Sequence, residues 1–156
     1  MMNKWIALAL FLLLCLGVAI AEGIATHHGV NNWYQTLVKP EGTPPNWVFP
    51  VVWTILYTMM AVSVWLIWLA PSGRKLTAYT LFAVQLFFNF LWSWLFFFYE
   101  NPALALIDIS LLWVAIIATM MAFYRHSHLA AGLLIPYLLW VSYAVHLNVM
   151  IWVFNS

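Results

Sequence analysis

Residues 33–57 read WYQTLVKPEGTPPNWVFPVVWTILY, a proline-rich aromatic segment that runs directly into an apolar stretch. Connections in compact domains are ordinarily short, and longer ones are usually functional or disordered. Its first part, residues 33–50, carries the aromatic residues Trp33, Tyr34, Trp47 and Phe49 together with Pro40, Pro44, Pro45 and Pro50. Proline fixes the backbone and aromatic rings are rigid, so the segment predicts a stiff lid that closes over something flat and apolar.

The composition around this segment is that of a chain immersed in lipid. Of the 156 residues, 67% are hydrophobic and 6% are charged, whereas soluble domains carry roughly 25% charged residues. The net charge of +1 gives no basic surface for nucleic acid. The sequence therefore predicts an integral membrane protein that does not bind nucleic acid.

Five apolar segments are long enough to cross a bilayer, whose core takes about 20 helical residues. They cover residues 5–25, 47–70, 76–99, 103–124 and 129–154. Lipid offers open strands no hydrogen-bond partners, so the expected fold is all-α, a single five-helix membrane domain over residues 1–156. The exceptional connection is a long loop over about 26–46. The first segment also resembles a secretory signal, but its apolar run is longer than a signal core and favours a retained helix.

Basic residues predict how this domain is oriented. Four of the five lie at the N-terminus or in the second and fourth connections: Lys4, Arg74, Lys75 and Arg125. The opposite side has Lys39, next to loop acids expected at Glu22, Glu41 and Glu100. Basic residues accumulate in the cytoplasm. We therefore expect a cytoplasmic N-terminus, with the first loop and the C-terminus outside.

Three predicted helices each place aromatic residues on one face, at spacings of three or four. The faces are Phe49, Trp53 and Tyr57; Gln85, Asn89, Trp92 and Phe96; and Trp140, Ala144, Leu147 and Asn148. One interpretation is ordinary packing with interfacial aromatic belts, which suits Trp5, Trp47, Trp68 and Trp152 near the span ends. The belt interpretation is weaker for Trp53, Trp92 and Trp140, which lie deeper and favour a pocket.

Polar residues inside the spans need partners, because an unpaired amide in hydrocarbon is costly. Gln85 and Asn89 either form hydrogen bonds between helices or anchor a ligand in an aromatic pocket, and the periodicity leaves both open. Asp108 is expected to accept hydrogen bonds from neighbouring helices or to reach water, with a proton relay as the alternative. His146 lies about 240° around its helix from Trp140 and is not expected to bind a metal. No hydrolytic motif occurs.

The residues now assembled resemble the TspO/MBR family, the translocator proteins once called peripheral-type benzodiazepine receptors. The resemblance covers nearly the whole chain. It rests on Trp33-Tyr34, Lys39-Pro40, Pro44-Pro45, Trp47, Trp53, Tyr57, Gln85, Asn89, Trp92, Asp108, Pro136-Tyr137, Trp140, Ala144 and Leu147-Asn148. It implies a five-helix bundle in the lipid bilayer, often a homodimer, with the first loop folded over a pocket.

The resemblance also implies ligands: porphyrins such as protoporphyrin IX, haem-related tetrapyrroles, sterols, and synthetic benzodiazepine or isoquinoline carboxamide drugs. By position it implies pocket residues Tyr34, Trp53, Asn89, Trp92, Trp140 and Ala144, and the helical faces add Phe49, Tyr57, Phe96 and Leu147. The lid would comprise Trp33, Lys39, Pro40, Pro44, Pro45 and Trp47. No obligatory cofactor or metal is expected, and protoporphyrin IX or haem would be a ligand.

Within that family the expected function is a receptor or sensor, with two alternatives. The first is light-dependent porphyrin degradation, with Trp53 and Trp140 as electron donors. The second is transport of a tetrapyrrole or sterol, although no inverted repeat supports a driven transporter. Gly42 replaces a tryptophan that relatives commonly have, which weakens the expected lid contacts. The fifth helix lacks the tyrosine and arginine of a proposed cholesterol motif, so sterol binding there has little support.

Overall fold

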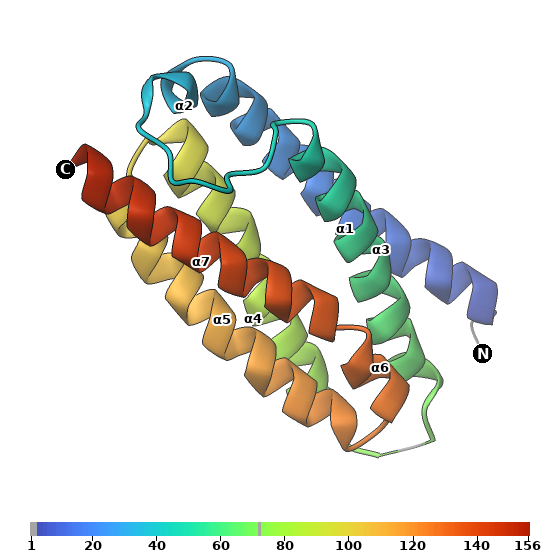
Figure 1. The fold of residues 1–156 in the computed structure, drawn as a ribbon. Coiled ribbons are helices and arrows are strands. Elements are labelled where there is room, and N and C mark those ends of the chain that lie inside the picture. Colours follow the sequence, from blue (N-terminus) through green and yellow to red (C-terminus); the bar gives the residue numbers. More distant parts are fainter. Residues whose placement is uncertain (1–2, 72) are drawn as a thin grey trace.

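The computed structural model describes residues 3–71 and 73–156, and within them all regular secondary structure is helical (Figure 1). Five helical segments in this part of the chain are long and apolar enough to cross a membrane. The prediction of an all-α, multi-pass membrane protein is confirmed. The elements are α1 (Lys4–Val30), α2 (Trp33–Thr36), α3 (Val48–Leu69), α4 (Leu76–Ser93), the π-helical turn η1 (Trp94–Phe98), α5 (Pro102–Tyr124), α6 (His128–Gly132) and α7 (Ile135–Asn155).

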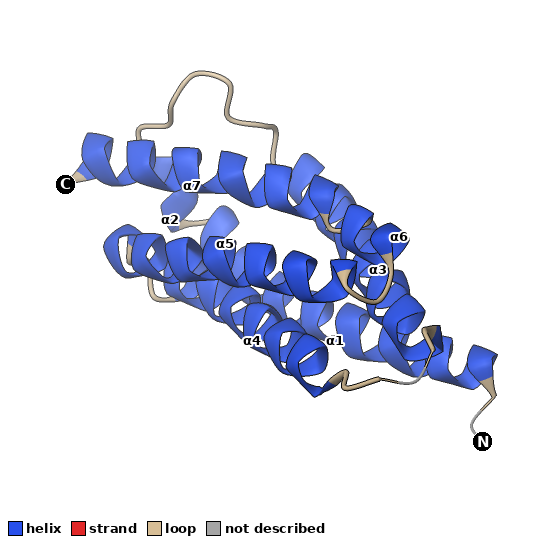
Figure 2. Ribbon diagram, turned by 90° about the horizontal axis from the view of Figure 1, so that it is seen from below, coloured by secondary structure: helices blue, strands red, loops and turns tan. Residues whose placement is uncertain are grey.

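The long helices lie side by side in one elongated bundle (Figures 1 and 2). α1 packs against α3 and η1, α4 packs against α5, and α5 packs against α7. The two ends of the chain lie at opposite ends of the bundle. The short helix α2 and the loop that follows it lie at the end of the bundle that holds the C-terminus, and the loop crosses to α3 on the side where α7 lies. This end contains the residues expected to bind a ligand.

The first span is longer than predicted. α1 continues to Val30 rather than ending near residue 25, so part of the expected loop is helical. The side chains of Asn31 and Asn32 donate to the carbonyls of His27 and His28, both at 3.0 Å, and satisfy groups that a helix end leaves unpaired. The extension leaves Glu22 well inside the span, which corrects its assignment to the acids on the loop side.

The third span ends in a wide turn. In η1 the amide of Tyr99 donates to the carbonyl of Trp94 at 2.9 Å, a bond that reaches one residue farther than an α-helical bond. Glu100 follows with a positive φ of 53°. Asn101 then caps α5 by accepting from the amide of Leu104 at 3.0 Å, and Pro102 occupies the first turn.

The fifth span is interrupted, whereas the sequence predicted one continuous helix over 129–154. α6 ends at Gly132 and α7 begins at Ile135. The cause is Pro136, which has no amide hydrogen and whose ring would clash with the carbonyl four residues earlier, that of Gly132. Ser127 caps α6 by accepting from the amide of Ala130 at 3.2 Å.

Candidate ligand-binding site

An aromatic crevice lies where α2, α3, α4, η1 and α7 meet. Its volume is about 20 Å³, which is room for about one water molecule. Trp92 stacks on Phe96 with ring centroids 5.4 Å apart, and Trp33 meets Phe96 edge-on at 5.6 Å. The crevice is therefore closed by its own rings. It is lined by Tyr34, Phe49, Trp92, Phe96, Phe97, Ala144, Leu147, Asn148 and Ile151.

The wide turn η1 supplies the inner wall of this crevice. Phe96 and Phe97 are adjacent in sequence, yet both are buried and both line the crevice. Their rings meet edge-on at 4.9 Å, and each also meets Tyr34 edge-on. The turn thereby packs two consecutive aromatic side chains against α2.

A larger cavity of about 530 Å³ lies between α1 and α3. This volume falls within the range of about 300–1,000 Å³ that is usual for small-molecule sites. Its lining is mostly apolar and includes the Trp53 ring, with polar groups at several depths. The lining residues are Leu16, Ala19, Ile20, Glu22, Gly23, Thr26, His27, Val30, Asn31, Asn46, Phe49, Pro50, Trp53, Thr54 and Ser93.

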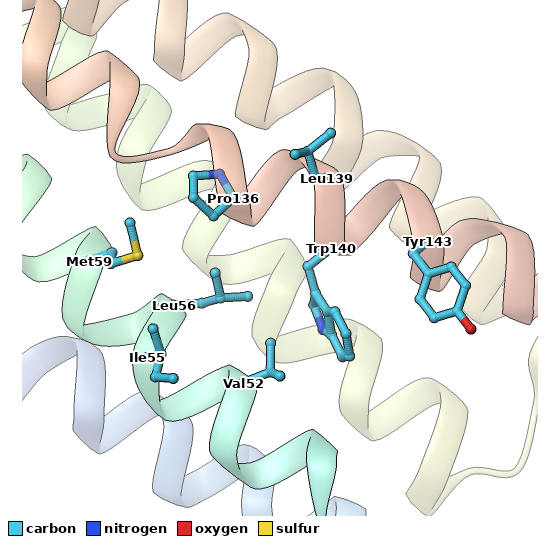
Figure 3. A pocket seen from close by; sticks show the side chains of 8 residues that line it. All are labelled: Val52, Ile55, Leu56, Met59, Pro136, Leu139, Trp140 and Tyr143. Atoms are coloured by element: carbon cyan, nitrogen blue, oxygen red, sulfur yellow. The ribbon is translucent and has the colours of Figure 1, made fainter. Parts of the chain in front are cut away.

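A third space is a groove of about 410 Å³ between α3 and α7 (Figure 3). The Trp140 ring extends from α7 towards α3, where Val52 and Leu56 extend towards α7. The groove is lined by Val52, Ile55, Leu56, Met59, Pro136, Leu139, Trp140 and Tyr143.

Phe49 separates these spaces. Its side chain lines both the crevice and the cavity between α1 and α3. Its ring also meets Trp140 edge-on, with centroids 6.2 Å apart. The three tryptophans expected in one pocket, Trp53, Trp92 and Trp140, therefore line three adjoining spaces arranged around one phenylalanine.

A buried chain of hydrogen bonds links α1, α3 and α4. The Asn89 side-chain amide donates to the Tyr57 hydroxyl at 2.9 Å, and that hydroxyl donates to Oε1 of Glu22. Ser93 donates to Oε2 of Glu22 at 3.4 Å. Tyr57 and Asn89, both predicted site residues, thus connect α1, α3 and α4 and do not line any of the three spaces described above.

A second pair of hydrogen bonds involves the other intramembrane amide. The Tyr137 hydroxyl donates to Oε1 of Gln85 at 2.8 Å, and Nε2 of Gln85 points to the sulfur of Met60 at 3.9 Å. Gln85 and Asn89 therefore form bonds between helices, which was one of the two alternatives that the sequence left open. Oδ1 of Asn89 has no hydrogen-bond partner among residues 3–71 and 73–156.

Asp108 differs from expectation. It is buried, but neither carboxylate oxygen has a hydrogen-bond partner in the described part of the chain. The amide donors of neighbouring helices are used elsewhere: Asn148 donates to the carbonyl of Pro102 at 2.8 Å and accepts from Trp92 at 3.1 Å. His146 is exposed on α7, facing away from the bundle as expected.

The lid is fastened to α7 at two points. Asn155 exchanges two hydrogen bonds with the backbone of Val38, at 2.9 and 3.0 Å, and the Tyr143 hydroxyl donates to the carbonyl of Gly42 at 2.6 Å. Gly42 has a φ of +85°, a conformation that favours glycine and explains why no aromatic side chain occurs there.

The predicted lid residues divide into inward and outward groups. Lys39 lies over the Tyr34 ring at 4.7 Å, and Pro40 is buried. Pro44 is half-buried and Pro45 is exposed. Trp47 is 68% exposed and faces away from the crevice. Burial, with a smaller contribution from nearby Tyr143, raises the pKa of Tyr34 to about 12, so its hydroxyl stays protonated at neutral pH.

Comparison with known proteins shows the family to which the chain belongs. The sequence model of the TspO/MBR family matches residues 11–153. The chain belongs to the TspO/MBR family. It is 46% identical over 152 residues to the tryptophan-rich protein TspO of Chlorobaculum tepidum, and the aligned region covers 94% of this chain and 95% of that protein. It is 40% identical over 119 residues to the tryptophan-rich sensory protein of Cereibacter sphaeroides, 76% of this chain and 73% of that one. The translocator protein of Homo sapiens is 37% identical over 123 residues, 77% and 73% of the two chains.

Sequence reasoning about this TspO/MBR member missed several residues at the site. Glu22 was counted among the acids on the loop side because of its charge. A signal was present, since Cys15, Glu22 and Gly29 recur every seven residues and all three are buried on one side of α1. Tyr143 and Asn155 gave no comparable signal, because their roles depend on the path of the loop.

Proposed function

We propose that this TspO/MBR member is a membrane receptor or sensor that binds porphyrins, such as protoporphyrin IX, and haem-related tetrapyrroles. The observation that carries the proposal is the arrangement of three tryptophan-lined spaces around Phe49. A planar apolar ring gains affinity by stacking and by burial of its area against such residues. The Cereibacter sphaeroides relative is named a tryptophan-rich sensory protein, which supports the sensor class.

The entry of a tetrapyrrole requires the rings to move. The crevice beneath the lid has about 20 Å³, whereas the adjoining cavity has about 530 Å³. A change in the position of Phe49 joins these two spaces, because its side chain borders both. In the proposed complex the ring occupies the cavity beside Trp53 and reaches towards Trp92 and Trp140, while the lid closes above it.

The test is a titration of protoporphyrin IX into the detergent-solubilised protein, followed by the shift of the porphyrin absorption band. Replacing Trp53→Phe together with Trp140→Phe is expected to weaken binding about fivefold or more, because each aromatic contact contributes about 0.5–1.5 kcal/mol. The matched control is Trp5→Phe with Trp152→Phe, at exposed positions outside the site. Equal affinities in the two double variants would show that the proposed pocket is wrong.

Light-dependent porphyrin degradation is the competing function, with Trp53 and Trp140 as electron donors. Here Trp53 lines the cavity between α1 and α3 and Trp140 lines the groove between α3 and α7, an arrangement that favours binding over a shared redox site. Illumination of the porphyrin complex separates the two functions. A new absorption band that requires both tryptophans would favour the enzyme, and an unchanged spectrum would favour the receptor.

The orientation proposed here places the lid outside the cytoplasm. Arg74, Lys75 and Arg125 lie in connections at the end of the bundle opposite the lid, together with the N-terminus. Because Cys15 is the sole cysteine and is buried, single-cysteine labelling can test the proposal. In a Cys15→Ala background, Glu41→Cys should react with an impermeant thiol reagent from outside intact cells, and Gly73→Cys should not. The reverse pattern would invert the assignment.

A further inference from the structure

Glu22 is a buried carboxylate on the wall of a cavity. It lies on α1, 4% exposed, and is one of the residues that line the 530 Å³ space between α1 and α3. Both of its oxygens are held in place: the Tyr57 hydroxyl donates to Oε1, and the Ser93 hydroxyl donates to Oε2 at 3.4 Å. The side chain is therefore fixed, with three helices contributing to its position.

The hydrogen bonds that Glu22 receives come from neutral groups. In the described residues, its two partners are hydroxyls, and one of those bonds is long at 3.4 Å. Burial among neutral partners disfavours the charged form of this carboxyl group, and a positively charged partner removes that cost. A carboxylate accepts at several lone-pair positions, so two hydroxyls leave room for a further donor. A donor that also carries positive charge satisfies both requirements.

The rest of the cavity specifies the body of the ligand. Around Glu22 the lining is mostly apolar, with the Trp53 and Phe49 rings on the α3 side. The adjacent Gly23 lines the same space, and a Cβ added there would meet no heavy atom within 4 Å. From Leu16 to Asn31 the lining extends about 20 Å along α1, at 1.5 Å per residue. An elongated apolar molecule fits this space.

We propose that the cavity between α1 and α3 binds an apolar molecule that carries one protonated amine. The ammonium group donates to Glu22, and the apolar body lies along α1 against Trp53. A hydrogen bond to a charged group contributes more than one between neutral groups. A ligand carboxylate gives Glu22 no positive partner, so an acidic ligand placed in this cavity gains nothing from directing its carboxylates towards Glu22. The proposed amine site does not depend on tetrapyrrole binding.

The test uses three probes that share one body and differ in charge: 4-phenylbutylamine, 4-phenylbutanol and 4-phenylbutyrate. Each is titrated calorimetrically into the full-length protein in detergent, with protein-free micelles as the blank. The amine should bind most tightly and the carboxylate most weakly. Equal affinity for the amine and the alcohol would overturn the proposal.

Two variants locate the site, and each has a matched control. Glu22→Gln keeps the size of the side chain but removes its charge, and should weaken amine binding about tenfold while leaving the alcohol unchanged. Glu41→Gln makes the same change in the exposed loop and should have no effect. Retention of the full preference for the amine in Glu22→Gln would show that another group binds it.

Gly23→Leu adds a side chain to the cavity at a position where a Cβ meets no heavy atom within 4 Å, and it should abolish binding of all the probes. Gly17→Leu is its control, because a Cβ there also meets nothing within 4 Å and Gly17 does not line the cavity. Unaltered amine binding in Gly23→Leu would overturn the location. Protoporphyrin IX is proposed to occupy the same cavity, so its titration into the native protein is run in parallel: amine binding without porphyrin binding would overturn the tetrapyrrole function alone, and porphyrin binding without amine preference would overturn the amine site alone.

Discussion

Gly29 of α1 lies directly against the backbone of Phe97 in η1. A Cβ at this position would approach the Cα of Phe97 to 2.8 Å, closer than real Cβ atoms come to other heavy atoms. The atoms it would meet belong to the backbone and cannot move aside as a flexible side chain can. The absence of a side chain at residue 29 thus permits α1 to hold the wide turn, and with it the aromatic wall of the crevice.

Gly29→Ala should therefore lower the free energy of unfolding by about 1–3 kcal/mol, because it overpacks a backbone contact. The measurement is the thermal midpoint in detergent. Gly17→Ala is the control: it has open space and should be neutral or stabilising, since alanine favours helix by about 1 kcal/mol. If the two variants have the same thermal midpoint, the close approach of Gly29 to the Phe97 backbone does not constrain the fold.

Tyr57→Phe should destabilise the bundle by about 1–3 kcal/mol, because it removes the hydroxyl between Asn89 and Glu22 and leaves two buried polar groups short of a partner. The exposed Tyr99→Phe is the matched control. Asn89→Leu should lower the free energy of unfolding less when it is introduced into Tyr57→Phe than when it is introduced into the native protein. Strict additivity of the two changes would contradict the linked network.

Tyr143→Phe should loosen the lid without disturbing the bundle. It deletes the bond to the carbonyl of Gly42 and leaves the ring in place. Loss of a bond of about 1 kcal/mol should accelerate protoporphyrin IX dissociation about fivefold in stopped-flow displacement. Tyr124→Phe, at an exposed position on α5, should leave the rate unchanged. Slower dissociation, or an equal effect of both variants, would argue against a lid fastened at this point.

Phe49→Leu should speed association of protoporphyrin IX. A smaller side chain between the crevice and the cavity lowers the barrier to joining them, while a hydrophobic residue of similar shape keeps most of the packing. Phe87→Leu, on the lipid-facing side of α4, is the control. An association rate that does not change would show that Phe49 does not limit entry.

Much of the fold could be predicted because lipid simplifies the problem. In hydrocarbon an apolar run of about 20 residues has few alternatives to a helix, so the number and type of spans follow from length and composition. The caps at Asn101 and Pro102 were predictable for a local reason, since each acts on the backbone within one turn. The interruption at Pro136 had a visible cause, but whether a proline kinks or breaks a helix depends on the surrounding packing.

The site was less predictable because it depends on distances across the bundle. Helical periodicity identified the inward faces that contain Gln85 and Asn89, yet it could not decide whether their amides meet other helices or a ligand. The buried role of Glu22 could not be predicted, because its partners on α3 and α4 are remote in sequence. The division of the expected pocket by Phe49 depends on side-chain positions that no pattern of spacing records.

The wide turn η1 has a consequence for how this bundle could be altered or could have arisen. A bond from residue 99 to residue 94 encloses one residue more than an α-helical turn, so η1 is equivalent to an α-helix with a single residue inserted. Deleting one residue there would rotate everything beyond it by about 100° relative to the rest of α4. The placement of both Phe96 and Phe97 in the wall of the crevice thus depends on a single extra residue, and a one-residue deletion at this turn would change the shape of the crevice.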